Sequence, residues 1–154
     1  MSTDLWRFAK DYYQRPGVEA ACLRLQEQGA DVCLLICAVW LERRGVACSP
    51  QRAEQLQGLA QPWRRQVVEP LRQLRQDWRA AARGDDALAA LREHIKRLEL
   101  EAERLQLQRL AAACGAWPGT APRVSAAWLQ ALAPAGAAAD DEALALLRAA
   151  ARLP

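Results

Sequence analysis

Residues that favour β-strands are scarce in this chain. It has one phenylalanine and two tyrosines, and no strand-length run of valine, isoleucine, threonine or tyrosine. Strands are enriched in these residues, whereas alanine, leucine, arginine, glutamine and glutamate, which dominate here, lose little entropy in a helix. The composition therefore argues against a β fold and predicts an all-α protein.

Residues with catalytic or metal-binding chemistry are also few. The only histidine is His94, and no Gly-x-Ser-x-Gly motif, P-loop or glycine-rich phosphate motif occurs. The five cysteines have no disulfide-framework spacing; Cys33 and Cys37 lie one helical turn apart, but a closed zinc site needs four ligands. We therefore predict no catalytic residue, metal site or cofactor, and we expect these cysteines to be small buried hydrophobic residues.

Long apolar segments are absent. The longest apolar run, from Val32 to Leu41, has ten residues, whereas a membrane-spanning helix needs about 20. The run therefore predicts a buried helix and no membrane association. The first residues are charged from Asp4 onward and contain no apolar signal region, so we expect a cytoplasmic protein with reduced thiols. The net charge of +3 is too small to predict binding to nucleic acid by itself.

Apolar periodicity and helix-breaking residues divide the chain into helices. The expected helices cover residues 5–14, 17–28, 31–44, 50–60, 62–83, 86–114, 124–132 and 140–151. The helix over 31–44 should be central because it is apolar on nearly every side. We expect Pro62 to begin a new helix and Pro70 to kink or divide it. The interpretation is a single helical bundle of five to six main helices over residues 1–115. An Ala/Pro-rich C-terminal appendage follows over 116–154; it contains two short helical segments, and we expect it to be dispensable for folding.

The helix over 86–114 carries a heptad pattern of apolar residues. Its members alternate by three and four positions: Leu88, Leu91, Ile95, Leu98, Ala102, Leu105, Arg109 and Ala112. Packing along the bundle is the favoured interpretation. The alternative is an intermolecular coiled coil, which would make the protein a homo-oligomer through this helix.

Helix 62–83 carries a stripe of arginines opposite its apolar face, which runs from Trp63 to Trp78. The stripe consists of Arg65, Arg72, Arg75, Arg79 and Arg83, with Arg64 beside it. The simplest interpretation is a solvated polar face. The alternative is a partner-binding surface for carboxylates or phosphates, and Trp117, in a Pro/Gly-rich loop, is the candidate for an exposed binding residue.

The N-terminal third of the chain resembles a known family. The residues that carry the resemblance are Leu5, Trp6, Phe8, Tyr12, Pro16-Gly17-Val18, Ala21-Cys22-Leu23, Leu25-Gln26, Asp31-Val32 and Trp40-Leu41. They resemble the uncharacterised proteobacterial proteins grouped as domain of unknown function 2390, and the resemblance extends to about residue 115. It implies a short, cytoplasmic, helical bacterial protein and supplies no reaction, ligand or catalytic residue.

Three functional hypotheses follow. The first is a non-enzymatic protein-binding or adaptor module with an unidentified protein partner. The second is an RNA- or ribosome-associated factor that uses the arginine stripe. The third is a small-ligand sensor or enzyme with a pocket near helices 5–14 and 31–44, where Asp11, Tyr12, Tyr13 and Glu42 supply polar groups.

Overall fold

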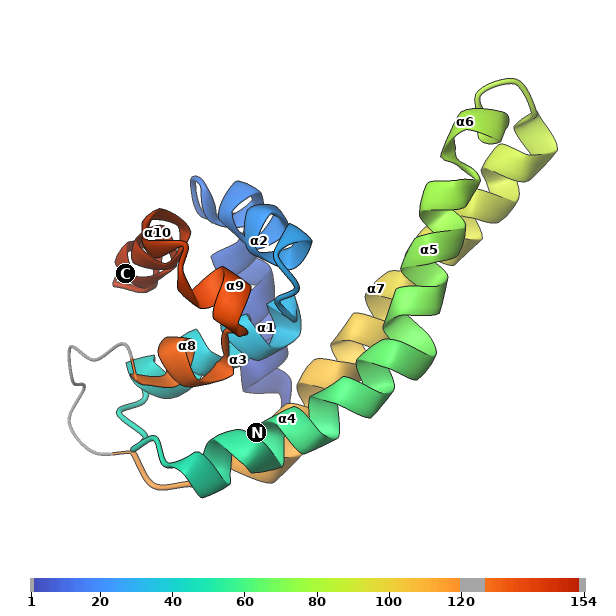
Figure 1. Ribbon diagram of the computed structural model, residues 1–154. Helices are drawn as coiled ribbons and strands as arrows, with labels where there is room; N and C mark the ends of the chain where they lie inside the picture. The colour runs from blue at the N-terminus through green and yellow to red at the C-terminus, as the bar shows by residue number, and fades with distance from the viewer. Residues whose placement is uncertain (1, 120–126, 153–154) are drawn as a thin grey trace.

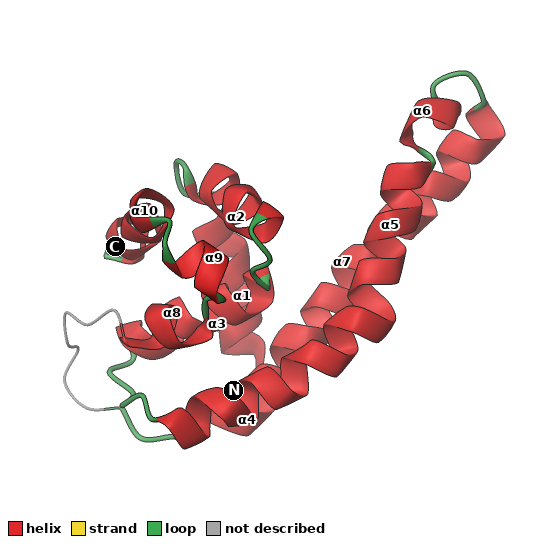
Figure 2. Cartoon of the chain, viewed as in Figure 1, coloured by secondary structure: helices red, strands yellow, loops and turns green. Residues whose placement is uncertain are grey.

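The computed structural model describes residues 2–119 and 127–152, and the regular elements of these ranges are helices (Figures 1 and 2). No β-strand occurs within the two ranges; an isolated antiparallel bridge pairs Val46 with Gly119. The all-α prediction is therefore confirmed.

The helices form two parts. In chain order they are α1 (Ser2–Tyr13), α2 (Val18–Glu27), α3 (Val32–Arg43), α4 (Pro50–Trp63), the π-helical segment η1 (Arg64–Val68), α5 (Glu69–Asp77), α6 (Arg79–Ala82), α7 (Asp86–Cys114), α8 (Ala127–Leu132), α9 (Ala135–Ala138) and α10 (Asp141–Ala151). We call α1–α3 and α8–α10, with the adjoining ends of α4 and α7, the head. The hairpin consists of η1, α5, α6 and the N-terminal half of α7, and it projects away from the head (Figure 1).

Helix α3 is the centre of the head. Its residues from Cys33 to Leu41 are all buried, and it packs against α1, α2, α4, α7, α8 and α10. Asp31 caps its N-terminus, because the Asp31 carboxylate accepts the backbone N–H groups of Cys33 and Leu34. The prediction that this helix is central is confirmed.

The first limb of the hairpin is one helical run from Pro50 to Asp77, so the prediction that Pro62 begins a new helix is wrong. Pro62 lies inside α4. A proline there removes one main-chain hydrogen bond, but tertiary contacts hold the helix across the gap. The indole N–H of Trp63 donates to the Ala102 carbonyl at 2.8 Å, and the Arg109 guanidinium lies 4.0 Å from the Trp63 ring centroid.

The distortion expected at Pro70 takes the form of a π-helical turn. In η1, directly before this proline, the Glu69 N–H donates to the Arg64 carbonyl, five residues back. The wider turn moves carbonyl groups away from the proline ring, which would clash with the preceding turn of a regular helix. The limb therefore passes Pro70 without ending.

Helix α7 is covered unevenly along its length. Its buried side chains all lie from Glu99 onward, where it meets α1, α3 and α4, whereas its N-terminal half meets α5 and α6. Leu91 and Leu98 remain 54% and 52% exposed. The C-terminal half of α7 therefore packs against the head, but mainly through residues outside the heptad pattern, of which only Ala102 is buried. The prediction that the heptad pattern packs along the bundle is wrong for most of its members.

The C-terminal helices contribute to the same core as α3. Trp128 and Leu129 of α8 and Leu144 and Leu147 of α10 are buried in it, and the Tyr12 hydroxyl donates to the Leu147 carbonyl at 2.6 Å. The division of the chain at residue 115 stays a prediction, but this burial reverses our expectation that 116–154 is dispensable. The predicted helix start at 124 lies outside the described residues.

Candidate functional site

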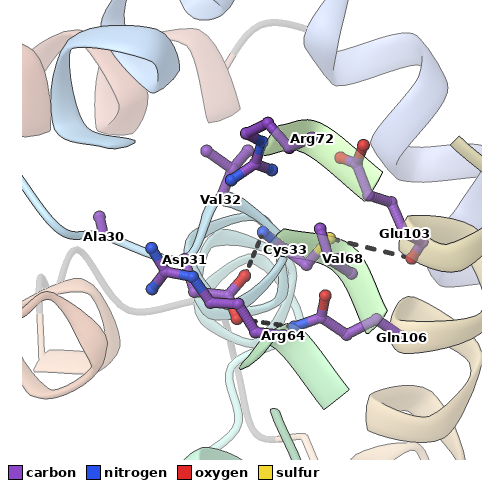
Figure 3. Close-up of a pocket in the computed structure, with 9 residues that line it drawn as sticks. All are labelled: Ala30, Asp31, Val32, Cys33, Arg64, Val68, Arg72, Glu103 and Gln106. Atoms are coloured by element: carbon purple, nitrogen blue, oxygen red, sulfur yellow. Dashed lines mark hydrogen bonds between the residues drawn. The ribbon is translucent and has the colours of Figure 1, made fainter. Parts of the chain in front are cut away.

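Charged and polar side chains converge where the hairpin joins the head (Figure 3). They come from the start of α3, from η1, from α5 and from the middle of α7. We call this set the junction cluster: Asp31, Arg64, Arg72, Arg75, Glu99, Glu103 and Gln106. Sequence reasoning did not find it, because its members share no motif and are brought together only by the tertiary fold.

Asp31 is the innermost carboxylate of the junction cluster. Besides capping α3, it accepts a hydrogen bond from the Gln106 side-chain amide at 2.6 Å. Burial raises the pKa of Asp31, and the Gln106 bond, the charge of Arg64 and the two backbone N–H bonds oppose that increase. The carboxylate thus ties α3 to α7 and orders the junction.

Glu99 is a nearly buried carboxylate held by two arginines of α5. Arg72 Nε lies 3.2 Å from one Glu99 oxygen, and Arg75 donates to both oxygens. Arg72 and Arg75 therefore point toward α7, and the prediction of one arginine face that is free to point outward is wrong for them. Replacing either by glutamate would set carboxylates against Glu99 and destabilise the hairpin.

The other predicted binding residues are spread over the surface. Arg65, Arg79 and Arg83 are exposed on the hairpin. Trp117 is not the exposed residue that we expected: it is half-buried, stacks on Trp128 with ring centroids 5.9 Å apart, and is covered by the Arg52 guanidinium. A binding role for these residues stays a prediction.

The cavity within the junction cluster is too small for a substrate. Its volume is ≈ 10 Å³, which is about the space of one water molecule. The Cys33 thiol beside it contacts the Glu103 carbonyl, and burial raises its pKa well above the ordinary thiol value. A protonated, enclosed thiol is a poor nucleophile, so the cavity does not support covalent catalysis.

A wider, open recess lies beside the cluster, between the end of α2 and α5, and shares Arg64 and Arg72 with it. Its volume is ≈ 290 Å³, and it is lined by Gln26, Glu27, Arg64, Glu69, Arg72, Gln73 and Gln76. Both of its arginines already face carboxylates, because Arg64 pairs with Glu69 at 2.9 Å and Arg72 with Glu99. The recess therefore has little net charge to attract an anion.

The polar groups expected to line a ligand pocket near α1 and α3 are used inside the fold. Tyr12 bonds to Leu147, Asp11 pairs with Arg15 at 3.0 Å, and Glu42 accepts the Leu129 N–H at 3.1 Å. Burial raises the pKa of Glu42 to about 7. The Tyr12 and Glu42 contacts join α1 and α3 to the C-terminal helices, which is a structural role, whereas the Asp11 pair lies at the surface.

Large hydrophobic side chains are exposed on the hairpin. Leu74, Leu91 and Leu98 are 39%, 54% and 52% exposed, and Val67, Leu71, Trp78, Leu88 and Ile95 beside them are half-buried. Arg75 and Glu99, which pair across the two helices, follow Leu74 and Leu98 by one position. The two helices are right-handed and run antiparallel. In both helices, the residue one position before the one that makes the pair therefore lies on the same side of the hairpin, so Leu74 and Leu98 share a side. We call this side the apolar face.

Residues 4–110 match a family described as a protein of unknown function (DUF2390). The chain belongs to the DUF2390 family. The match extends from α1 into the C-terminal part of α7 and therefore includes both the junction cluster and the apolar face. No curated protein and no solved structure matches the chain.

Two further findings concern the described part of this DUF2390 chain. None of its helices combines the length and the apolar character needed to cross a membrane. Within the same ranges, no group of three or more His, Cys, Asp and Glu side chains is placed to hold a metal ion. Neither the family nor the junction cluster thus points to a reaction.

The junction cluster of the DUF2390 chain predicts a pH-dependent stability. Burial, followed by the charge of Glu99, raises the pKa of Glu103 to about 7 from 4.5. Between these values the folded state binds the extra proton, so stability falls as the pH rises through this range. The Glu103→Gln variant cannot ionise. The quantity to compare is the free energy of unfolding of the variant minus that of the parent. We expect this difference to increase by about 1–3 kcal/mol between about pH 5 and about pH 8.

Urea unfolding at the two pH values measures this difference. Glu54→Gln, at an exposed glutamate of α4, is the control, and its difference from the parent should be the same at both. If the difference in free energy of unfolding between Glu103→Gln and the parent is also the same at both pH values, Glu103 ionises as freely in the folded protein as in the unfolded chain, and the prediction is wrong.

Proposed function

We propose that this chain is a protein-binding module and that the apolar face of the hairpin is its binding surface. The observation that supports this proposal is the exposure of Leu74, Leu91 and Leu98 on a part of the chain that projects from the head (Figure 1). Burying apolar surface contributes about 25 cal/mol per Å². Grouped exposed leucines on a rigid helix pair therefore favour contact with another protein.

The shape and chemistry of the apolar face define the partner. Two antiparallel helices present parallel ridges that accept helices packed against them. The residues beside the leucines include Pro70, Ala81, Ala87 and Ala90, which carry no charge and leave room for close approach. The partner should therefore present an apolar helical surface, and ion pairs should contribute little to its recognition.

The arginines favour this proposal over RNA binding. Arg72 and Arg75, in the middle of the stripe, share the Glu99 carboxylate and point toward α7 rather than to solvent. Of the other arginines of the stripe, Arg65, Arg79 and Arg83 are exposed, and three separated arginines are a small electrostatic footprint for phosphate binding. No group in the junction cluster supports an enzymatic role.

Site-specific photo-crosslinking in the source cell tests the proposal. A benzophenone amino acid at Leu98 lies on the apolar face. The matched control carries it at Leu100, which is equally exposed at 56% but points to the other side of α7. We expect covalent protein adducts from position 98 and few from position 100. If position 98 yields no more adduct than position 100, the apolar face does not bind protein.

A further inference from the structure

We infer that the partner of the apolar face is a second copy of this chain, with two hairpins packed face to face as a four-helix bundle. The inference rests on the proposed function of the hairpin as the binding element. It commits to an antiparallel arrangement with a two-fold axis close to Leu98. In such an arrangement, the contact is made by the same patch on both copies.

The head leaves this side of α7 free. It contacts α7 through residues on other sides of the helix: the Glu103 carbonyl meets Cys33, Gln106 meets Asp31 and Cys114 meets Cys37. On the side of Leu98, by contrast, Leu105 is half-buried and Arg109 and Ala112 are exposed, whereas Ala102, the heptad residue that directly follows Leu98, is buried beside Trp63 of α4. The hairpin of a second copy that lies along this side of α7 would pass beside Trp63 of α4 and the Arg109 guanidinium that covers it, without meeting α1 or α3.

The available area reaches what a specific dimer needs. With the axis near Leu98, residues 88–108 of α7 overlap in the two copies, which corresponds to a contact roughly 30 Å long and about 20 Å wide across two helices. It buries about 600 Å² on each copy and about 1,200 Å² in total, which is the lower end of standard interfaces. We therefore expect a dimer of moderate, micromolar affinity.

The charges near the axis suit two identical faces. A second copy doubles every charge, so a self-complementary face must be poor in charge or place opposite charges together. The exposed side chains next to Leu98 on this side are His94, four residues before it, and Glu101, three residues after it, and Glu101 pairs with Arg104 within α7. In the antiparallel arrangement, His94 of one copy lies beside Glu101 of the other, and both Leu98 side chains meet at the axis. No like charges therefore meet at the axis.

Sedimentation equilibrium over a roughly hundredfold range of protein concentration tests the dimer by mass action. We expect the parent chain to shift from the mass of one chain to that of two. Leu98→Glu sets two carboxylates against each other in an apolar contact, and it should raise the dissociation constant at least about tenfold. Leu100→Glu, off the face, should behave as the parent, and circular dichroism should show that both variants keep the helical content of the parent.

The register has its own test. A Leu98→Cys variant under mild oxidation should form a disulfide-linked dimer, because the two introduced thiols meet at the axis, and Leu100→Cys should not. A disulfide-linked dimer that forms equally from both variants would overturn this register.

The inference of a second copy is overturned if the parent keeps the mass of one chain throughout, or if Leu98→Glu and Leu100→Glu associate equally well. In the first case, a crosslinked adduct with a different protein from position 98 would leave the proposed function standing. If that position also yields no adduct, the proposed function fails as well.

Discussion

A chain that ends at Gly115 should lose its cooperative unfolding transition. The deletion removes five large side chains that are almost fully buried: Trp128, Leu129, Leu132, Leu144 and Leu147. Each such side chain contributes about 1.5–3 kcal/mol by burial, so together they match the whole stability of a typical domain, about 5–15 kcal/mol. The deletion also uncovers the face of α3 on which α8 packs. Thermal unfolding followed by circular dichroism measures the loss.

Point variants separate this effect from a general effect of truncation. Trp128→Ala leaves a large cavity and an unpaired Val46 carbonyl, which now accepts the indole N–H at 2.8 Å, and should cost about 3–5 kcal/mol. Leu59→Ala, at a leucine 41% exposed, is the control and should cost far less. If the truncated chain unfolds cooperatively with the parent's midpoint, residues 116–154 form an appendage as the sequence predicted.

The local signals in the sequence were sufficient for most of the helices and for the starts of several of them. Asp31 and Ser49 accept backbone N–H groups at the starts of α3 and α4, as their residue types and positions predict. The unbroken apolar character of α3 predicted its central place. These features depend on neighbours within one or two turns, which a single sequence displays directly.

Contacts between distant parts of the chain could not be predicted in the same way. The heptad pattern of α7 is real, but periodicity cannot tell that its C-terminal half meets the head while Leu91 and Leu98 stay uncovered. The arginine stripe likewise gave no sign that Arg72 and Arg75 face Glu99, more than 20 residues away. Pro62 was misread because its lost hydrogen bond is offset by the contact of Trp63 with α7.

The composition of the C-terminal segment was misleading for a related reason. Alanine, proline and glycine are typical of loops and linkers, and we interpreted residues 116–154 as an appendage with two short helical segments that is dispensable for folding. In the structure, the alanines allow α8 and α10 to approach α3 and α2 closely, and the few large side chains between them fill the remaining space. Composition reports the average character of a segment, whereas its role in the core depends on the position of a few residues.

Leu35→Asp should unfold the head. Leu35 lies near the start of α3, is 0% exposed, and belongs to the buried core. An aspartate at this position loses the burial of the leucine side chain and leaves a cavity. It also buries a carboxylate, and the buried stretch of α3 contains no cation that could pair with it. The free energy of unfolding should fall by more than about 4 kcal/mol, which leaves little or none of a typical domain's stability.

The matched control is Leu23→Asp on α2. Leu23 is 46% exposed, so its carboxylate remains in water, and the cost should stay within about 1 kcal/mol. Urea unfolding of both variants, followed by tryptophan fluorescence, compares two identical chemical changes that differ only in burial. Equal unfolding midpoints for the two variants would mean that α3 can rotate so that position 35 is exposed to solvent. In that case α3 is not the fixed centre of the head against which α8, α10 and the hairpin pack.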